Sequence, residues 1–309
     1  MNVLSLFDGI GTGQLALKHL NFKVDKCVAY EIDELPKSIA MRHFPDTDYR
    51  GDVKEFNVKD FDFKFDLVMG GSSCNDLSNA MANRDGIVGS KSSIFFEFVR
   101  ILKSVKPKYF LFENVGSMSK ADEIIITQML GCEPIKINSK DYSPALRNRY
   151  YWTNIPQDKH DNAFKNDINL NDILEDGWYS DRKKARALLA SDSRPLTSPI
   201  KMMHRYINTG FTTVVFRNKE IADMMIKDFK ERFYGLKAKD IDMESIDKNI
   251  YSSENIRYLN QLELESCQTI PHGYTDGLTR NQAAHVLGNG WTCLVIMKLL
   301  NGMEMEKTL

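Results

Sequence analysis

Short apolar runs alternate with amphipathic segments along the first half of the chain. Helical spacing of apolar residues predicts helices at 13–20 and 94–105, the second capped by Ser92 or Ser93. Buried strands are predicted at residues 2–7, 24–30, 65–69, 109–114, 133–138 and 149–154. Alternating strands and helices are typical of a parallel sheet with helices on both faces, so we expect an α/β, Rossmann-like fold.

The sequence FDLVMGGSSCNDLS, residues 65–78, is the feature around which this pattern is arranged. Its apolar run ends in Gly70 and Gly71, which allow a sharp exit from a central parallel strand. Ligands of open α/β sheets bind at the carboxyl edge, so Cys74 is well placed to act as a nucleophile. A buried structural thiol is the commoner role of a free cysteine, and this stretch alone leaves both readings open.

The first predicted strand leads into a glycine-rich turn, FDGIGTG, and then into a helix. Glycines let the backbone approach a ligand closely, and the helix N-terminus favours a carboxylate or phosphate. Glu31 ends the next strand, at roughly the ~20-residue spacing at which an acidic group meets ribose hydroxyls. A tight corner without a ligand is the simpler reading of the turn, and Glu31 favours a nucleotide site.

Charged side chains stand at the ends of two later strands. Glu113 follows a hydrophobic run, where a carboxylate is costly unless it has a partner, so it is a candidate functional group. Arg147 and Arg149 face the same side if the chain is extended. Such a pair is usually a solvated edge, but beside a catalytic cysteine it is suited to binding a phosphate and a carbonyl oxygen.

The order of four motifs, FDGIGTG, GGSSCNDLS, FENV and RNRYYW, resembles the DNA cytosine-5 methyltransferase family. Within that family the resemblance is strongest to the catalytic domain of the animal de novo enzymes, which share the FFEF helix, residues 95–98. It covers nearly the whole chain and is weakest between 157 and 250. It implies a methyltransferase version of the Rossmann-like fold in a stand-alone enzyme of bacterial or phage type.

The resemblance implies a role for each motif. Cys74 would be the nucleophile that attacks a flipped cytosine, with Glu113 as the partner of its N3 atom and Arg147 and Arg149 beside it. S-adenosylmethionine would be bound by Phe7, Asp8, Gly9, Ile10, Thr12, Glu31, Ile32, Asp52, Val53, Asn289 and Trp291. Substrate contacts are expected from Ser72, Asn75, Asn114, Arg182, Lys183 and Lys184. Ser73 stands where the family commonly has proline, which leaves the loop before Cys74 less stiff.

Three segments are expected. Residues 1–156 would form the catalytic domain, 157–250 the target-recognition region, and 251–309 a segment that returns to the catalytic domain. The middle segment contains a turn at 208–210 followed by a β-like run, which together predict a hairpin. It also holds a basic run, residues 182–205, with seven basic residues against Asp192. Such a run is usually a solvated face, but here it is a candidate for contacts with the phosphates of double-stranded DNA.

Composition limits the remaining possibilities. A net charge of −1 provides no global basic field, so DNA contacts must come from a local patch. The five cysteines contain no CxxC pair, which predicts neither a disulfide framework nor a metal site and suits the cytoplasm, or the nucleus of a eukaryote. No apolar run reaches membrane-spanning length, so no membrane association is expected. The sequence sets neither the target context nor the oligomeric state, monomer or homodimer.

Two other functions stay open at this stage. A catalytically silent relative would serve as a DNA-binding partner, although the complete set of Cys74, Glu113, Arg147 and Arg149 favours an enzyme. An RNA cytosine-5 methyltransferase is the second alternative, because a transfer-RNA methylating branch shares this catalytic core. The sequence NDLS after Cys74 is more similar to the DNA branch.

Overall fold

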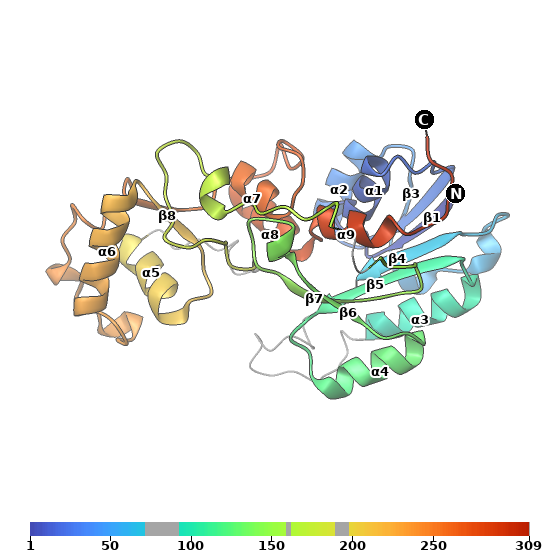
Figure 1. The fold of residues 1–309 in the computed structure, drawn as a ribbon, viewed down its shortest axis with the longest axis horizontal. Helices are drawn as coiled ribbons and strands as arrows, with labels where there is room; N and C mark the ends of the chain where they lie inside the picture. The colour runs from blue at the N-terminus through green and yellow to red at the C-terminus, as the bar shows by residue number, and fades with distance from the viewer. Residues whose placement is uncertain (72–92, 159–161, 189–197, 309) are drawn as a thin grey trace. The chain divides into compact units, whose positions relative to one another are not determined.

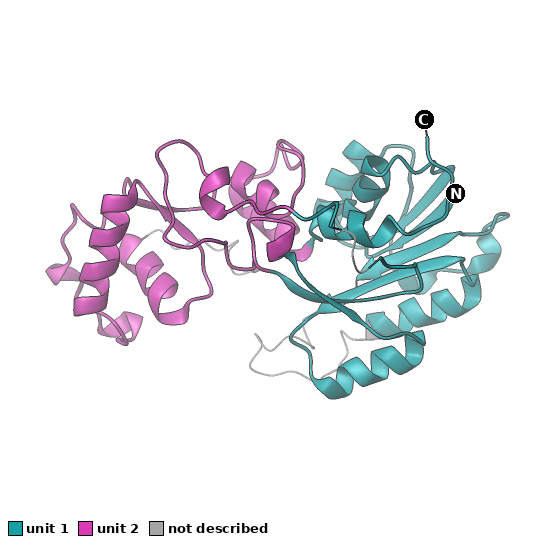
Figure 2. Cartoon of the chain, viewed as in Figure 1, with its two compact units in different colours: residues 1–139, 147–165, 290–309 teal, residues 140–146, 166–289 magenta. Residues whose placement is uncertain are grey.

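A computed structural model describes residues 1–71, 93–158, 162–188 and 198–308 of the 309-residue chain. The chain forms two compact units (Figure 2). Unit 1 comprises residues 1–139, 147–165 and 290–309, and unit 2 comprises 140–146 and 166–289. Residues 251–289 therefore lie in unit 2 and the last 20 residues in unit 1, while the functional roles of these segments stay predictions.

Unit 1 is built on a seven-stranded sheet with the order β3-β2-β1-β4-β5-β7-β6. Its strands are β1 (Asn2–Leu6), β2 (Lys26–Tyr30), β3 (Asp48–Arg50), β4 (Leu67–Gly71), β5 (Tyr109–Val115), β6 (Ile135–Asn138) and β7 (Asn148–Thr153). The first five in this order are parallel, and β7 runs antiparallel to both of its neighbours. The predicted α/β fold is confirmed, with β4 near the centre of the sheet.

Helices cover both faces of this sheet (Figure 1). They are α1 (Thr12–His19), α2 (Glu34–His43), α3 (Ser93–Val105), α4 (Lys120–Leu130) and α9 (Cys293–Leu300). In the view of Figure 1, α1, α2 and α9 lie above the sheet and α3 and α4 below it. The C-terminal helix α9 packs against α1, so the end of the chain completes the layer that its beginning starts.

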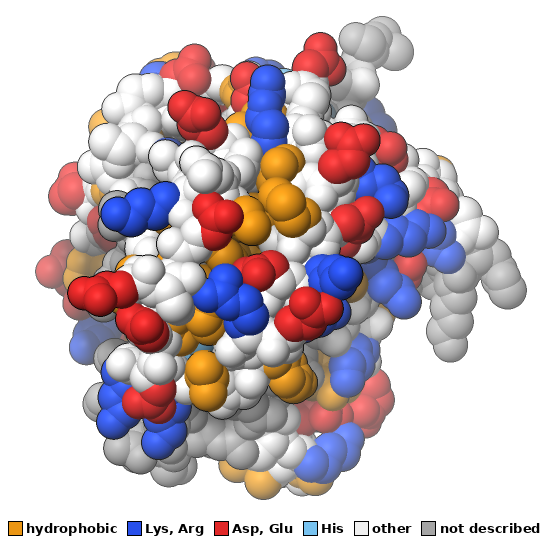
Figure 3. Space-filling view, turned by 90° about the vertical axis from the view of Figure 1, so that its left-hand side faces the viewer, with side chains coloured by type: hydrophobic (Ala, Val, Ile, Leu, Met, Phe, Trp, Pro, Cys, Tyr) orange, Lys and Arg blue, Asp and Glu red, His pale blue; other side chains and the backbone are white. Residues whose placement is uncertain are grey.

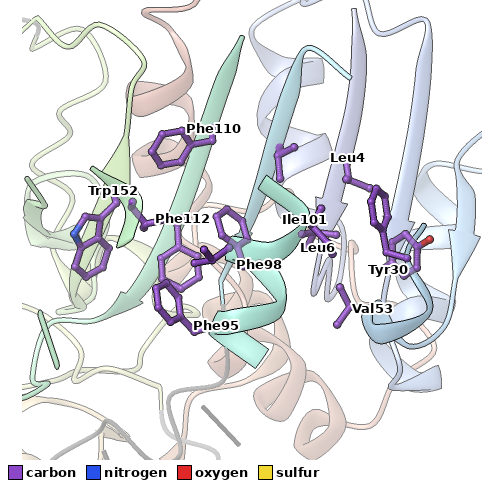
Figure 4. Packing of buried hydrophobic residues seen from close by; sticks show 14 of the residues in the cluster. Leu4, Leu6, Tyr30, Val53, Phe95, Phe98, Ile101, Phe110, Phe112 and Trp152 are labelled. Carbon is purple, nitrogen blue, oxygen red and sulfur yellow. The ribbon is translucent and has the colours of Figure 1, made fainter. Parts of the chain in front are cut away.

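The core on the α3 face follows the predicted helical spacing. Phe95 and Phe98 are fully buried, and their rings lie 5.2 and 4.7 Å from the ring of Phe112 on β5 (Figure 4). Trp152 on β7 extends this aromatic layer at 5.9 Å from Phe112. Ser93 lies inside α3 and not at its cap, and Ser92 lies outside the described residues.

Unit 2 has its own hydrophobic core around a two-stranded antiparallel sheet. Its elements are α5 (Pro199–His204), β8 (Val214–Phe216), α6 (Lys219–Arg232), β9 (Ile256–Tyr258), α7 (Gln261–Cys267) and α8 (Arg280–Asn289), with short turns of 3-10 helix elsewhere. The predicted hairpin at 208–216 is wrong. Arg205–Thr209 form a π-helical turn, and β8 pairs with β9, whose sequence lies some forty residues further along. Short-range turn signals do not reveal such a distant partner.

The stretch Arg280–Leu300 has the length and mean hydropathy, 1.3, of a membrane-spanning helix. This differs from the expectation that no apolar run is long enough. The stretch is interrupted between α8 and α9, and 61% of its apolar window is buried inside the protein. Core helices of folded proteins commonly have these properties, so the stretch is weak evidence for a membrane.

Candidate active site

The carboxyl ends of β4 and β5 lie side by side, as the parallel pairing requires. Gly71, the last described residue of β4, is paired with Glu113 on β5. A Cβ atom on Gly71 would lie 2.7 Å from Glu113 Oε2, so only glycine fits here without displacement. Ser72, Cys74 and Asn75 lie outside the described residues, and the chain reaches Cys74 three residues after Gly71.

Glu113 is buried, with 7% of its surface exposed, and both of its carboxylate oxygens have a neighbour. Arg149 Nε lies 2.8 Å from Oε1, and the indole Nε1 of Trp291 donates a hydrogen bond of 3.1 Å to Oε2. Oε1 receives no hydrogen bond from the described residues, so its contact with Arg149 is an ion pair. The site therefore presents a buried, oriented carboxylate. Its Oε1 atom can still accept a hydrogen bond from a ligand.

The two arginines have different partners. Tyr151 is the residue of β7 opposite Glu113, so Arg149, two positions away, is on the same face and its long side chain reaches the carboxylate. Arg147 precedes β7 and is buried, and its Nη2 donates a 2.7 Å hydrogen bond to the carbonyl oxygen of Gly290. Arg149 therefore acts on Glu113, whereas Arg147 holds the backbone next to Trp291.

Asn114 follows Glu113 but is turned into the protein. It is 1% exposed, and its Oδ1 accepts a hydrogen bond from the amide of Val115 at 2.7 Å. Substrate contact by this side chain therefore stays a prediction that the burial does not favour.

The glycine-rich turn adopts the strained backbone that a ligand site often requires. Phe7, Gly9 and Gly11 all have positive φ angles, of 58°, 58° and 77°, and Phe7 is the only one with a side chain to strain. The amide of Gly9 donates to Glu31 Oε2 at 2.9 Å. The amide of Asp33 donates to Oε1 at 2.8 Å, and burial raises the pKa of the Glu31 carboxyl. Glu31 thus links the turn to the end of β2.

Several of the expected cofactor residues lie around this turn. Ile32 is 72% exposed, which is unusual for isoleucine and suits contact with a planar apolar ring. Thr12 is 3% exposed, and its Oγ1 has no hydrogen-bond partner among the described residues, so it is available to a ligand. Ile10 and Val53 are buried, and Asp52 caps the 3-10 turn Val53–Glu55 by accepting from the amide of Lys54.

Asp8 is directed inward by hydrogen bonds. Its carboxylate accepts from Ser5 Oγ at 2.5 Å and from Gln14 Nε2 at 2.9 Å, and Gln14 in turn accepts from Thr47. Burial raises the pKa of the Asp8 carboxyl to about 6. Asp8 therefore stabilises the turn by linking β1 to α1 through hydrogen bonds, which the sequence pattern did not predict.

This raised pKa has a measurable consequence for stability. Between its ordinary pKa of 3.8 and the folded value of about 6, Asp8 binds more protons in the folded than in the unfolded protein, so its contribution to stability falls as pH rises through this window. The Asp8→Asn variant lacks this loss. We expect its unfolding free energy, relative to wild type, to rise by roughly 2 kcal/mol between pH 4 and pH 7, measured by urea denaturation. A difference that does not change with pH would contradict a buried, titrating Asp8.

Trp291 packs closely against two glycines of unit 1. Its ring edge would lie 3.2 Å from a Cβ on Gly13 in α1, and its Nε1 would lie 3.0 Å from a Cβ on Gly71. The contact with Glu113 joins residues 178 positions apart, and no local signal in the sequence predicts it. Asn289 belongs to α8 of unit 2, where its side chain approaches His285 at 3.5 Å.

The basic run contributes fewer free cations than its sequence suggests. Arg182 donates to the carbonyl oxygens of Thr212 and Tyr206 and stacks on the Tyr206 ring at 3.9 Å. Lys184 donates to two other carbonyl oxygens of unit 2, and Arg194 lies outside the described residues. Lys183 is different, because 69% of its side chain is exposed. Figure 3, which looks onto the α6 end of unit 2, shows acidic and basic side chains interspersed.

The model of the C-5 cytosine-specific DNA methylase family matches residues 1–304. The chain belongs to this family. Its members use S-adenosylmethionine and act on cytosine C5 in DNA, as the resemblance of the motifs implied. Among the described residues no group of three or more His, Cys, Asp or Glu side chains is arranged to hold a metal ion.

Three curated relatives come from a phage, a bacterium and a plant. The orphan methyltransferase M.SPRI of Bacillus phage SPR is 27% identical over 76% of this chain and 52% of its own length. The type II methyltransferase M.NgoPII of Neisseria gonorrhoeae is 31% identical over 51% of this chain and 49% of its own length. The DNA (cytosine-5)-methyltransferase DRM1 of Arabidopsis thaliana is 38% identical over 35% of this chain and 19% of its own length. The chain thus spans about half, or less, of these relatives, and the resemblance to the animal de novo branch stays a prediction.

Solved structures share the fold over nearly the whole chain. A DNMT2 variant from Spodoptera frugiperda superposes with a TM-score of 0.68 at 18% identity, covering 97% of this chain and 98% of that one. A DNA modification methyltransferase encoded within an Escherichia coli prophage has a TM-score of 0.60 at 20% identity, with 98% of both chains covered. At these identities the likeness concerns the fold alone.

Proposed function

We propose that this protein transfers a methyl group from S-adenosylmethionine to C5 of cytosine in double-stranded DNA, with Cys74 as the nucleophile. The observation that carries the proposal is the Glu113 carboxylate. It is buried at the carboxyl edge of the sheet, oriented by Arg149 and Trp291, and paired through β4 with Gly71, from which the chain leads to Cys74.

The chemistry requires two groups at one base. Cytosine C5 is a weak nucleophile until a thiolate adds to C6, which makes the ring enamine-like. Cys74 forms this C6–S bond, and Glu113 is the partner of N3 while charge builds on the ring. After C5 has been methylated, its proton is lost and the C6–S bond breaks, which releases the cysteine. The target base must leave the helical stack to reach both groups.

The other cysteines support the assignment to Cys74 by their environment. Burial raises the pKa of each of the four thiols that the structure describes. These are Cys27, Cys132, Cys267 and Cys293. A nucleophilic cysteine must instead be readily ionised, so none of the four is suited to the reaction.

The turn around Glu31 fits the methyl donor. S-adenosylmethionine, when bound, supplies the methyl group as an electrophile on its sulfonium. Glu31 would take the ribose hydroxyls, the exposed Ile32 would flank the adenine ring, and the unpartnered Thr12 Oγ1 would bond a polar group of the ligand. The Trp291 ring would close the pocket near Gly13.

Cofactor affinity is therefore expected to depend on Glu31. Loss of a charged hydrogen-bond partner costs about 1.5–3 kcal/mol, so Glu31→Ala should weaken binding of S-adenosylhomocysteine by roughly ten- to a hundredfold in calorimetry. Glu34→Ala is the matched control, because Glu34 is a nearby carboxylate whose side chain is 82% exposed. If both variants bind S-adenosylhomocysteine with equal affinity, Glu31 does not bind the ribose.

We infer that residues 157–250 recognise the target, and Lys183 tests the phosphate part of this proposal. Each neutralised phosphate contributes about −0.9 to the log–log slope of DNA affinity against salt. Lys183→Ala should thus flatten the slope by up to about one unit. It should weaken binding to DNA of every sequence to a similar extent. Lys219→Ala, at a lysine with the same 69% exposure on α6, should leave it unchanged. If the two variants keep the wild-type slope, Lys183 belongs to a solvated face.

Bisulfite sequencing of unmethylated duplex DNA, after incubation with the purified protein and S-adenosylmethionine, tests the function directly. The expected result is conversion-resistant cytosine in a defined sequence context. Methyl transfer to competing RNA in preference to DNA would favour the RNA alternative. DNA binding without transfer to either substrate would favour the catalytically silent relative.

A further inference from the structure

The two oxygens of Glu113 are held by side chains from two distant parts of the chain. Arg149, on the adjacent strand β7, approaches Oε1, and Trp291, just before α9, donates its indole N–H to Oε2. A carboxylate paired at one oxygen only can rotate about its last side-chain torsion, which has a broad energy profile. The second contact, from Trp291, removes that freedom.

Trp291 is itself held rigidly. Its ring lies against Gly13 and Gly71, where added Cβ atoms would come within 3.2 and 3.0 Å of it. The preceding residue, Gly290, accepts a 2.7 Å hydrogen bond from the buried guanidinium of Arg147. Arg147 therefore fixes the backbone at the point where the indole is directed toward the carboxylate.

We propose that Trp291 is a positioning residue for Glu113, in addition to any role as a wall of the cofactor pocket. Its indole N–H keeps Oε2 occupied, so that Oε1 is the oxygen presented to the base. A pocket wall requires only the shape of the ring, whereas this role requires the N–H group. The inference rests on the proposed function, because it presumes that Glu113 acts on the cytosine.

The kinetic test separates the N–H group from the ring. In Trp291→Phe the donor is lost, and a 3-benzothienylalanine at position 291 has the ring shape of tryptophan with sulfur in place of N–H. Loss of one hydrogen bond to a charged group predicts about a tenfold fall in kcat for both variants. In the benzothienyl variant the affinities for S-adenosylhomocysteine and DNA should equal those of wild type. Wild-type kcat in that variant would overturn the proposal.

A second measurement is independent of activity. The chain has three tryptophans, Trp152, Trp178 and Trp291, and therefore three indole N–H signals in a ¹⁵N-correlated NMR spectrum. Trp291→Phe identifies the signal of Trp291. The Glu113→Gln variant should shift that signal upfield, since an amide oxygen is a weaker acceptor than a carboxylate. Trp152, which donates to Thr127 Oγ1, is the internal control and should not move.

The two measurements distinguish the possible failures. A Trp291 signal that does not respond to Glu113→Gln shows that the hydrogen bond is absent, and the inference then fails whatever the activity. A wild-type protein that transfers no methyl group to DNA, but retains the NMR response, contradicts the proposed function and leaves the contact itself intact.

Discussion

Replacement of Cys74 by alanine is expected to abolish methyl transfer while S-adenosylhomocysteine still binds with wild-type affinity. The reason is chemical, because C5 of cytosine does not attack the methyl donor until a thiolate has added to C6. Wild-type protein should also form a stable covalent adduct with duplex DNA containing 5-fluorocytosine, since fluorine at C5 cannot leave as a proton does. The adduct, detected by its slower migration in denaturing gels, should be absent in Cys74→Ala.

Cys132→Ala is the matched control for this experiment. Cys132 is a partly exposed thiol of unit 1 whose pKa is raised by burial, so its loss should change neither adduct formation nor turnover. Methylation by Cys74→Ala at a rate near that of wild type would show that another group is the nucleophile.

The Glu113→Gln variant is expected to lose most of its turnover and to keep its fold. Glutamine has nearly the same shape but cannot take part in proton transfer at N3, and positioned acid–base groups contribute on the order of 10²- to 10⁴-fold. We therefore expect the rate constant of methyl transfer to fall by that factor in single-turnover assays, and kcat to fall with it. The affinity for S-adenosylhomocysteine should change little, because the pocket residues are unaltered.

Glu97→Gln provides the comparison for Glu113→Gln. Glu97 is also a carboxylate of unit 1 that is paired with an arginine, Arg100, at 2.7 Å, but it lies on α3. Its loss should affect stability slightly and turnover not at all. A similar decline of kcat in both variants would mean that Glu113 serves the structure and not the reaction.

Six strands of unit 1 and its helices α1 and α3 could be predicted because their signals are local. The burial of Phe95 and Phe98 follows from helical spacing, and the strand that contains Glu113, β5, follows from an uninterrupted apolar run. The element ends differ from the predictions by a few residues at most. In unit 2 the prediction failed at the hairpin, because β8 pairs with a strand about forty residues later.

The partners of the polar site residues could not be predicted in the same way. Alternation indicated that Arg147 and Arg149 face the same side, but it did not reveal that one holds the Gly290 carbonyl and the other pairs with Glu113. Asp8 is expected in the cofactor pocket, which stays a prediction, but the sequence did not show that its carboxylate accepts hydrogen bonds from Ser5 and Gln14. A long or short polar side chain has several staggered rotamers, and the neighbours that the fold places beside it, near or distant in sequence, select among them.

The amino-acid sequence by itself determined the family, the α/β class, and the placing of Glu113 near the carboxyl end of a buried strand. Motif order and hydrophobic period carry that information, because both can be read along the chain without knowledge of which distant residues meet in the fold. The tertiary structure decided which side chains meet Glu113, and that Arg182 and Lys184, two of the cations expected at DNA, hold backbone carbonyls. Those outcomes depend on burial, since a buried donor or acceptor must find a partner wherever the folded chain supplies one.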